Sequence, residues 1–377
     1  MNADEFDPGV WRRQYQYRSF SPVAVNHEWR WTDPRINTLL ERATRALGEL
    51  NAFSLIVPDI DLFLEMHIAK EANQSSRIEG TQTAMGDAVM SEALVAPEKR
   101  DDWREVHNYI DALNHAIADL DRLPLSNRLI CETHAILMRG VRGEHKMPGE
   151  FRSSQNWIGG SGPSDAAFVP PHHSEIPGLM ADLEKFWHND EIEVPDLVRA
   201  AISHYQFETI HPFCDGNGRI GRLLITLYLI SKGLLHKPSL YLSDFFERHR
   251  ASYYDALMAV RTSGDMNHWL RFFLTGVAET ATKGRSTFQA ILALRTDSEE
   301  RVHTLGRRGT NGLALLQVLY RRPVMTVGEI AEAIDVSTPT ANTLVAEFER
   351  LGLLREVTGY ARNRLFVFET YLDLFSS

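Results

Sequence analysis

Residues 211–222 combine a histidine, a carboxylate, an amide and two arginines with three glycines, in the order His-Pro-Phe-Cys-Asp-Gly-Asn-Gly-Arg-Ile-Gly-Arg. Gly216 and Gly218 allow the backbone to turn tightly, so that successive N–H groups point inward and form a nest for an anion. An apolar helix is expected to follow over 219–232, and the positive end of its dipole adds to this nest. The segment therefore predicts a site for a phosphate chain.

The charged side chains of this segment suit chemistry on phosphate. Arg219 and Arg222 share a face of the first helical turn. Positive charge is unfavourable at this positive end of the helix dipole, but binding an anion such as phosphate offsets the cost. Asp215 is a hard oxygen ligand, suited to an Mg²⁺ ion that bridges phosphates. His211 can accept a proton from an attacking hydroxyl near neutral pH. Together these residues predict phosphoryl or nucleotidyl transfer.

Other interpretations of the segment explain less of it. The spacing Gly216-x-Gly218-x-x-Gly221, with Asp244 about twenty residues further on, also matches the dinucleotide-binding fingerprint. That fingerprint requires an apolar strand before the glycines, whereas a proline and a charge interrupt the sequence here. A metal hydrolase built on His204, His211 and Asp215 lacks a recognisable ligand spacing. A purely structural loop would leave the arginines unpaired against the dipole.

The segment resembles the signature of the Fic family, His-x-Phe-x-(Asp/Glu)-Gly-Asn-Gly-Arg-x-x-Arg, at every defining position. The resemblance covers residues from about 35 to 290 and implies a helical core that transfers AMP from ATP to a target hydroxyl. It implies that His211 is the general base, that Asp215 is the Mg²⁺ ligand and that Arg222 holds the γ-phosphate. The further ATP-binding residues that we assign on this basis are Gly216, Asn217, Gly218, Arg219, Ile220 and Gly221, then Ile158, Gly159, Gly160 and Ser161, and the adenine-side pair Tyr253 and Tyr254.

Two positions of the chain bear on which donor is used and how it is bound. The phosphotransferase branch of the family carries Lys where this chain has Gly218, so the resemblance favours nucleotidyl transfer. Arg261 stands near the place where some members have Asn, which leaves the nucleoside contacts there open.

A helix expected over 59–79 ends in Ser-Ser-Arg-Ile-Glu-Gly. The Glu79 carboxylate would face the negative end of that helix, and Arg77, two residues away, points in another direction. Glu79 is then either solvated or paired with a cation elsewhere. The segment resembles the inhibitory motif (Ser/Thr)-x-x-x-Glu-(Gly/Asn), with Ser75, Glu79 and Gly80 in place. This resemblance implies that Glu79 pairs with Arg222 and blocks productive placement of ATP.

Composition and length indicate a globular chain with two or three domains. The 377 residues are 44% hydrophobic and carry a formal net charge of -10, which excludes collagen-like and wholly disordered classes and disfavours general nucleic-acid binding. Apolar runs are too short for a bilayer span, and the acidic N-terminus lacks the apolar segment of a signal peptide. With Cys131 and Cys214 as the two cysteines, we expect a cytoplasmic protein without a disulfide framework.

The expected architecture is all-α. We divide it into an N-terminal helical region with the inhibitory motif (1–110), a Fic core with the helices that follow it (111–305), and a winged helix-turn-helix domain (306–377). The Fic core carries one β-hairpin, at about 156–171, which is called the flap below. The helix-turn-helix is expected over 327–351 and the two wing strands over 357–368.

The resemblance also implies partners. A target protein would dock on the flap as an added strand, with contacts from Trp157, Ile158, Phe168 and Val169, although Trp157 could equally pack on the core. We further expect ATP and Mg²⁺, self-modification, a homodimer and no membrane.

The winged-helix domain leaves its own partner open. Its formal charge is neutral, yet several arginines could touch DNA phosphates, so DNA binding and protein contact both stand. These arginines are Arg307, Arg308, Arg321, Arg322, Arg362 and Arg364. A rival function is a DNA-binding regulator whose Fic core senses nucleotide without catalysis. The complete motif argues against it, because a sensor needs no base.

Overall fold

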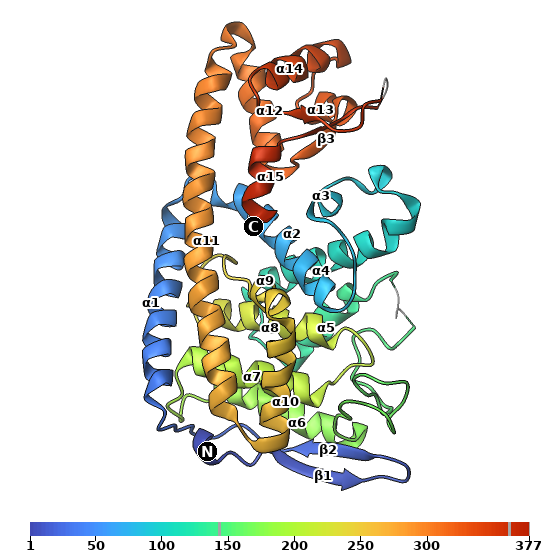
Figure 1. Cartoon of the computed structure of the whole chain (residues 1–377), viewed down its shortest axis with the longest axis vertical. Helices are drawn as coiled ribbons and strands as arrows, with labels where there is room; N and C mark the ends of the chain where they lie inside the picture. The colour runs from blue at the N-terminus through green and yellow to red at the C-terminus, as the bar shows by residue number, and fades with distance from the viewer. Residues whose placement is uncertain (142–144, 361–362, 377) are drawn as a thin grey trace.

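A long helix organises the protein. The computed structural model describes residues 1–141, 145–360 and 363–376. Helix α11 (Met266–His303) has 38 residues, which corresponds to about 57 Å. Helix α1 (Pro34–Ile56) packs along its lower half, and the C-terminal domain lies against its upper end (Figure 1). Among the described residues, no helix is long and apolar enough to cross a membrane.

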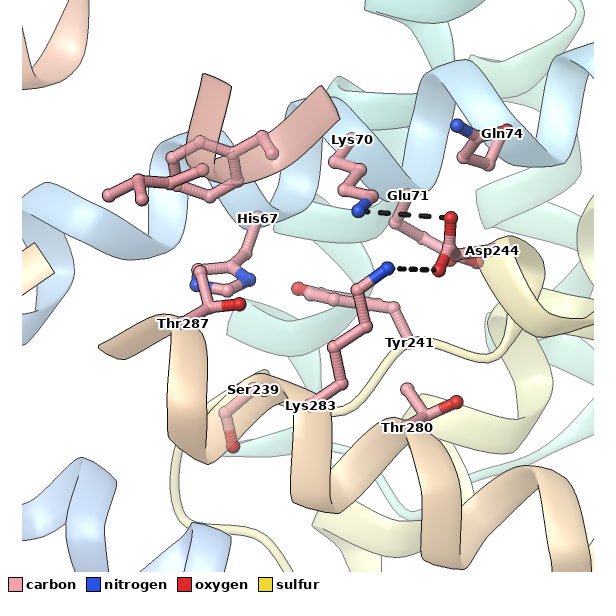
Figure 2. Close-up of a pocket in the computed structure, with 13 residues that line it drawn as sticks. His67, Lys70, Glu71, Gln74, Ser239, Tyr241, Asp244, Thr280, Lys283 and Thr287 are labelled. Carbon is pink, nitrogen blue, oxygen red and sulfur yellow. Dashed lines mark hydrogen bonds and ion pairs between the residues drawn. The ribbon is translucent and has the colours of Figure 1, made fainter. Parts of the chain in front are cut away.

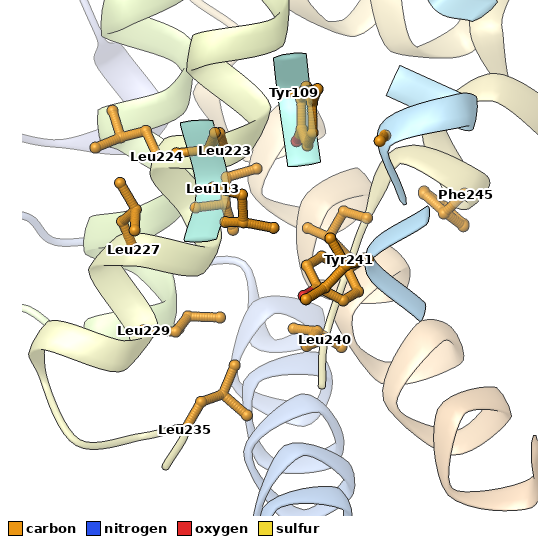
Figure 3. Close-up of a cluster of buried hydrophobic side chains, with 14 of the residues drawn as sticks. Tyr109, Leu113, Leu223, Leu224, Leu227, Leu229, Leu235, Leu240, Tyr241 and Phe245 are labelled. Carbon is orange, nitrogen blue, oxygen red and sulfur yellow. The ribbon is translucent and has the colours of Figure 1, made fainter. Parts of the chain in front are cut away.

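The Fic core surrounds two buried helices, α7 and α8. Almost every residue of both is buried, as the nearly continuous apolar pattern of α8 predicts. Figure 3 shows Tyr109 and Leu113 of α4 meeting Leu223 and Leu227 of α8 in this core. The helices of the core are α2 (Ile60–Ile78), α3 (Met85–Ala88), α4 (Arg100–Leu120), α5 (Asn127–Leu137), α6 (Ile176–His188), α7 (Asp196–Ile210), α8 (Asn217–Ser231), α9 (Ser243–Arg248) and α10 (Arg250–Ser263).

Short 3₁₀ turns join several of these elements. They lie at Ala3–Glu5, Glu92–Leu94, Pro97–Lys99, His173–Glu175 and Gly306–Arg308.

An antiparallel hairpin that the sequence does not predict stands before the helices. Strand β1 (Gly9–Arg13) pairs with β2 (Arg18–Pro22). The Phe20 N–H donates to the Val169 carbonyl at 2.9 Å, and the Phe20 ring packs on Phe168. Strand β2 reads Arg-Ser-Phe-Ser-Pro, and both of its serines are buried although their side chains are polar. The alternation of apolar and polar residues by which a sequence indicates a strand is therefore missing from this segment.

The flap is less regular than the sequence predicts. The expected hairpin is reduced to one antiparallel bridge, in which Ile158 and Phe168 exchange hydrogen bonds of 2.8 and 3.1 Å. Gly159 and Gly160 follow with φ of 70° and 71°, which ends the pairing at once. The flap is thus a loop held at its base.

The C-terminal domain is a winged helix. Helix α12 (Gly309–Arg321) precedes the helix-turn-helix, which is formed by α13 (Val327–Ala333) and α14 (Thr338–Arg350). Strands β3 (Val324–Thr326), β5 (Leu365–Val367) and β4 (Arg355–Glu356) form an antiparallel sheet in that order, and α15 (Glu369–Ser376) closes the domain. Arg362, predicted in the wing, lies outside the described residues.

The winged helix packs directly on α2, the helix that carries the predicted inhibitory motif. The Tyr320 ring of α12 lies 5.4 Å from that of Phe63, and the Phe375 ring of α15 lies 5.0 Å from that of His67. Arg321 forms an ion pair with Glu65 at 3.5 Å. Helix α2 is therefore held between the Fic core and the winged helix (Figure 1).

Candidate active site

The loop that joins α7 to α8, residues 211–216, is shaped by its own side chains and is called the motif loop below. His211 ends α7 in the left-handed region with φ of 51°. The side-chain amide of Asn217 then binds both backbone groups of Phe213: its oxygen accepts from the N–H and its nitrogen donates to the carbonyl, each at 2.8 Å. Gly216, with φ of 74°, begins α8. Asn217, predicted to hold phosphate, is engaged in fixing this loop.

His134 supports the motif loop from α5, and the sequence does not single it out. Its ring stacks on Phe213 with centroids 3.8 Å apart. Its Nδ1 accepts from the Gly149 N–H at 2.8 Å, so its Nε2 donates to the Asp215 carbonyl at 3.0 Å. Burial lowers the pKa of His134 to about 4, so it is neutral at pH 7.

Arg152 ties the base of the flap to the motif loop. Its guanidinium is buried and donates to four backbone carbonyls, those of His211 at 2.9 Å, Ser154 at 2.8 Å, Pro171 at 2.7 Å and Ile210 at 3.4 Å. Asn156 donates to the same His211 carbonyl at 3.2 Å. A lone arginine in a loop carries no signal of such a role in sequence.

His211 lies partly buried at the end of α7, and this burial favours its neutral form. Burial lowers its pKa to about 4, and the charge of Arg261 acts in the same direction. Its Nδ1 is buried and has no hydrogen-bond partner within the described part of the chain. At neutral pH the ring is therefore uncharged, which is the form that can accept a proton.

Arg261 braces the end of α7. Its Nη2 donates to the Glu208 carbonyl at 2.9 Å, its Nε donates to Thr209 Oγ1 at 3.1 Å, and the guanidinium lies 4.1 Å from the centre of the Phe168 ring. The side chain is thus engaged with α7 and the flap, and the nucleoside contacts left open at this position stay open.

Asp215 lies half-exposed at the N-terminus of α8. Lys146 Nζ is 2.9 Å from one oxygen and Arg219 Nη2 is 3.8 Å from the other. Burial would raise the pKa of Asp215, but the hydrogen bond and charge of Lys146, the charge of Arg219 and the Gly216 N–H together lower it. The residues described contain no group of three or more His, Cys, Asp and Glu side chains arranged for a metal. One ionised carboxylate suits an Mg²⁺ ion that arrives with nucleotide phosphates and keeps its other ligands as water.

Arg222 meets the end of α2. Its Nε donates to Ser75 Oγ at 2.9 Å, and its Nη2 donates to the Ser75 carbonyl at 2.9 Å and to Glu79 Oε1 at 2.7 Å. The Arg222 side chain is 1% exposed and that of Glu79 is 37% exposed. Burial opposes both charges, yet the attraction dominates, so the pKa of Glu79 is lowered and that of Arg222 is raised. Gly80 follows with φ of 104°.

Gly218 provides the space in which the Glu79 carboxylate lies. A Cβ atom built at position 218 would lie 2.2 Å from Glu79 Oε1 and 2.9 Å from Arg222 Nη1. The Glu79 side chain therefore covers the first turn of α8, next to the predicted anion nest.

We expect Gly218→Ala to destabilise the protein by about 1–3 kcal/mol, because the new methyl group overlaps the Glu79 carboxylate. In a Glu79→Ala background the overlap with the carboxylate is gone and the contact with Arg222 Nη1 at 2.9 Å remains, so the same change should cost clearly less than in the wild type. Urea unfolding of the four proteins measures this coupling. An equal cost in both backgrounds would show that Glu79 does not occupy this space.

Glu208 is a buried carboxyl that the sequence does not single out. A Cβ atom at Gly221 would lie 2.2 Å from its Oε1, and this oxygen has no hydrogen-bond partner among the residues described. Burial raises the pKa of Glu208 to about 7, although Arg222 opposes the shift. The folded state thus binds a proton that the unfolded state releases between about pH 4.5 and 7.

From this shift we expect the change in the free energy of unfolding caused by Glu208→Gln to be about 2–3 kcal/mol more favourable at pH 8 than at pH 4. Because the pKa of the Glu208 carboxyl is higher in the folded protein than in the unfolded chain, the free energy of unfolding falls as the pH rises through that range. Gln does not titrate, so the variant does not lose this stability. Denaturant unfolding at both pH values gives the difference. A gain of the same size at both would contradict the assigned pKa.

The remaining predicted ATP-binding residues are spread over the site. Tyr253 is 1% exposed and its hydroxyl bonds to His204 Nε2 at 2.8 Å, whereas Tyr254 is 39% exposed. Arg219 is buried, with Glu105 at 3.5 Å, and Ile220 is buried in the core. Gly159, Gly160 and Ser161 lie on the exposed tip of the flap, where the Ser161 N–H binds Asp165. Of the tyrosine pair, Tyr254 alone is accessible to a ligand in this structure.

Comparison with protein families agrees with the fold. The profile "Fic/DOC family N-terminal" matches residues 37–118, "Fic/DOC family" matches 124–229 and "MarR family" matches 311–361. The protein adenylyltransferase Fic of Aedes aegypti is 36% identical over 125 residues, which is 33% of this chain and 22% of that protein. Fic-1 of Caenorhabditis briggsae is 30% identical over 208 residues, 52% of this chain and 37% of that protein. The chain thus spans well under half the length of these curated relatives.

Solved structures share the fold. A Fic family protein from Desulfovibrio desulfuricans G20 aligns with a TM-score of 0.55 at 22% identity, over 89% of this chain and 96% of that one. Fic-1 from C. elegans aligns with a TM-score of 0.50 at 22% identity, over 70% of this chain and 76% of that one. With its motif loop, its helical core and its C-terminal domain, the chain is a member of the Fic/DOC family that also carries a MarR-family winged helix.

Proposed function

We propose that this protein transfers AMP from ATP to a hydroxyl side chain of a target protein, and that Glu79 restrains the reaction. The observation that carries the proposal is the placement of His211 at the end of α7, at the start of the loop that leads to the N-terminus of α8 with Asp215 and Arg219. The names of the curated relatives, protein adenylyltransferases, support the same activity.

In the proposed reaction, His211 takes the proton of the target hydroxyl as that oxygen attacks the α-phosphorus of ATP. The bond from the α-phosphorus to its bridging oxygen breaks and pyrophosphate leaves. Backbone N–H groups at the start of α8 would face the charge that develops on the phosphate oxygens, where the helix dipole also favours it. Mg²⁺, held by Asp215 and the phosphates, would neutralise further charge, and Lys146 would have to release Asp215 for this.

The proposed restraint follows from the contacts of Arg222. Three hydrogen bonds from this guanidinium go to Ser75 and Glu79. A γ-phosphate that needs Arg222 must displace Glu79, because both anions compete for the same donor. The Glu79 carboxylate above Gly218 also repels phosphate oxygens at the helix N-terminus.

The flap offers a surface for the target. Trp157 is 40% exposed beside the single bridge of Ile158 with Phe168. An extended target segment could add main-chain hydrogen bonds here, as in other strand-addition sites. Self-modification, a homodimer, a cytoplasmic location and the domain boundaries at 110 and 305 stay predictions.

The alternative, a DNA-binding regulator, draws on the MarR-family match. Several arginines predicted to touch DNA form ion pairs with carboxylates, since Arg308 lies 3.1 Å from Glu347 and Arg322 lies 2.7 Å from Glu329. Arginines whose charge is neutralised by a carboxylate attract DNA phosphates only weakly. This geometry favours the enzyme as the main function.

The test is incubation of the protein with Mg²⁺ and ATP labelled either at the α- or at the γ-phosphate. We expect covalent label from the α-position alone, because AMP is transferred and pyrophosphate leaves. Label from the γ-position would indicate phosphoryl transfer, and an unlabelled protein with every candidate target would favour the regulator.

A pH profile tests the state of His211. For a Glu79→Gly variant at saturating Mg²⁺, we expect that protonation of His211 does not lower kcat/KM for ATP between pH 8 and pH 6. The rate should fall as the pH approaches about 4, where the imidazole gains a proton. The same profile in a Glu208→Gln background separates the carboxyl that titrates near 7. A midpoint near 6.5 that survives this change would contradict the assignment.

A further inference from the structure

A cavity outside the active site lies where the Fic core meets the winged helix. It has a volume of about 50 Å³ and lies between α2, α11, the segment before α9 and the end of α15. Figure 2 shows that its side chains come from all of these elements and that His67 and Tyr241 point toward one another across it. The residues that line it include His67, Lys70, Tyr241, Asp244, Lys283 and Phe375.

Positive charge exceeds negative charge along one side of this cavity. Lys283 Nζ lies 3.1 Å from Asp244 Oδ2, and Lys70 Nζ lies 3.7 Å from Asp244 Oδ1 (Figure 2). Arg248 Nε lies 3.4 Å from the same carboxylate. Three cations therefore share Asp244, and Arg248 is the one that does not line the cavity itself. Counted with it, a net charge of about +1 remains around Asp244 even with Glu71 ionised. A further anion would be attracted to this side of the cavity.

Buried polar atoms line the rest of it. His67 Nε2 and the Tyr241 hydroxyl have no hydrogen-bond partner in the described ranges, and each residue is 8% exposed. The hydroxyl groups of Ser239 and Thr280, which also line the cavity, are likewise buried and have no hydrogen-bond partner among the described residues. Such groups are costly to bury unless something binds them. Ordered water is one possible occupant, and a ligand with oxygen acceptors is the other.

We propose that this cavity binds a small molecule that bears an oxyanion, phosphate or carboxylate. Lys70 and Lys283 would hold the anion and the Tyr241 hydroxyl would donate to it. The His67 ring, 5.0 Å from Phe375 of α15 and 4.5 Å from Phe288 of α11, would border its apolar part. The ligand would thus join the winged helix to α2, at a site separate from the motif loop.

The probes are inorganic phosphate and acetate, each compared with chloride at equal ionic strength. Amide hydrogen exchange in α15 of the full chain is the readout, because phosphate at the active site should not protect this helix. We expect slower exchange in α15 with phosphate, with acetate or with both, and the stronger probe identifies the anion. Lys283→Gln and Tyr241→Phe should each weaken the apparent affinity about tenfold, the value of one charge-assisted or buried hydrogen bond.

Two control variants locate the effect. Lys237→Gln removes a lysine that pairs with Asp61 outside the cavity, and Arg219→Ala alters the proposed phosphate cradle. Both should keep the protection of α15. Protection that persists in Lys283→Gln and Tyr241→Phe, or its absence in wild type with both probes, would overturn the proposal and leave water as the occupant.

Discussion

Glu79→Gly is expected to raise the rate of AMP transfer on the order of 10- to 100-fold, which corresponds to removing one charge-assisted competitor for Arg222. The released guanidinium can then bind the γ-phosphate, and the space above Gly218 no longer holds a carboxylate. Incorporation of α-labelled phosphate into the protein or its target measures the rate. A rate equal to or below wild type on a confirmed substrate would remove the restraint from this account.

Two controls separate the restraint from a general loosening of α2. Arg77→Gly changes a neighbouring residue that is exposed at the same helix end and should leave the rate unchanged. The double change Glu79→Gly with Arg222→Ala should be as slow as Arg222→Ala alone, because activation works through that guanidinium. Activation that survives loss of Arg222 would point to another mechanism.

His211→Ala is expected to lower AMP transfer by about 10²–10⁴-fold, the usual contribution of a positioned base. ATP should still bind, because the nest, Arg219 and Asp215 remain. Transfer measured in the Glu79→Gly background and nucleotide binding measured by calorimetry separate the two effects. His27→Ala, an exposed histidine distant in sequence from the motif, is the matched control. Activity of His211→Ala within a few-fold of its parent would contradict the assignment.

Much of the fold follows from local sequence. The Fic fold and the winged helix are confirmed, because long apolar periods, Gly80 after α2 and the break at 211–218 mark their elements directly. The contact between Glu79 and Arg222 follows from the resemblance to the inhibitory motif, because the helix dipoles alone leave a solvated Glu79 equally open.

The residues that hold the active-site loop in place could not be predicted from the sequence, for a physical reason. Arg152, His134 and Glu208 act through burial and through backbone groups distant in the chain, and their own neighbourhoods show no pattern. The flap is shorter than its apolar pieces suggest, because two glycines with positive φ end its pairing. The hairpin β1–β2 has little apolar alternation and is stabilised by contact with Phe168.

Intact-mass spectrometry of the Glu79→Gly protein after incubation with ATP and Mg²⁺ tests the central claim most directly. The same protein with His211→Ala is its paired control. The account predicts a gain of one or more AMP units on the single variant, or on an added target protein, and none on the double variant. A phosphate adduct in place of AMP, or an AMP adduct of equal yield without His211, would contradict it.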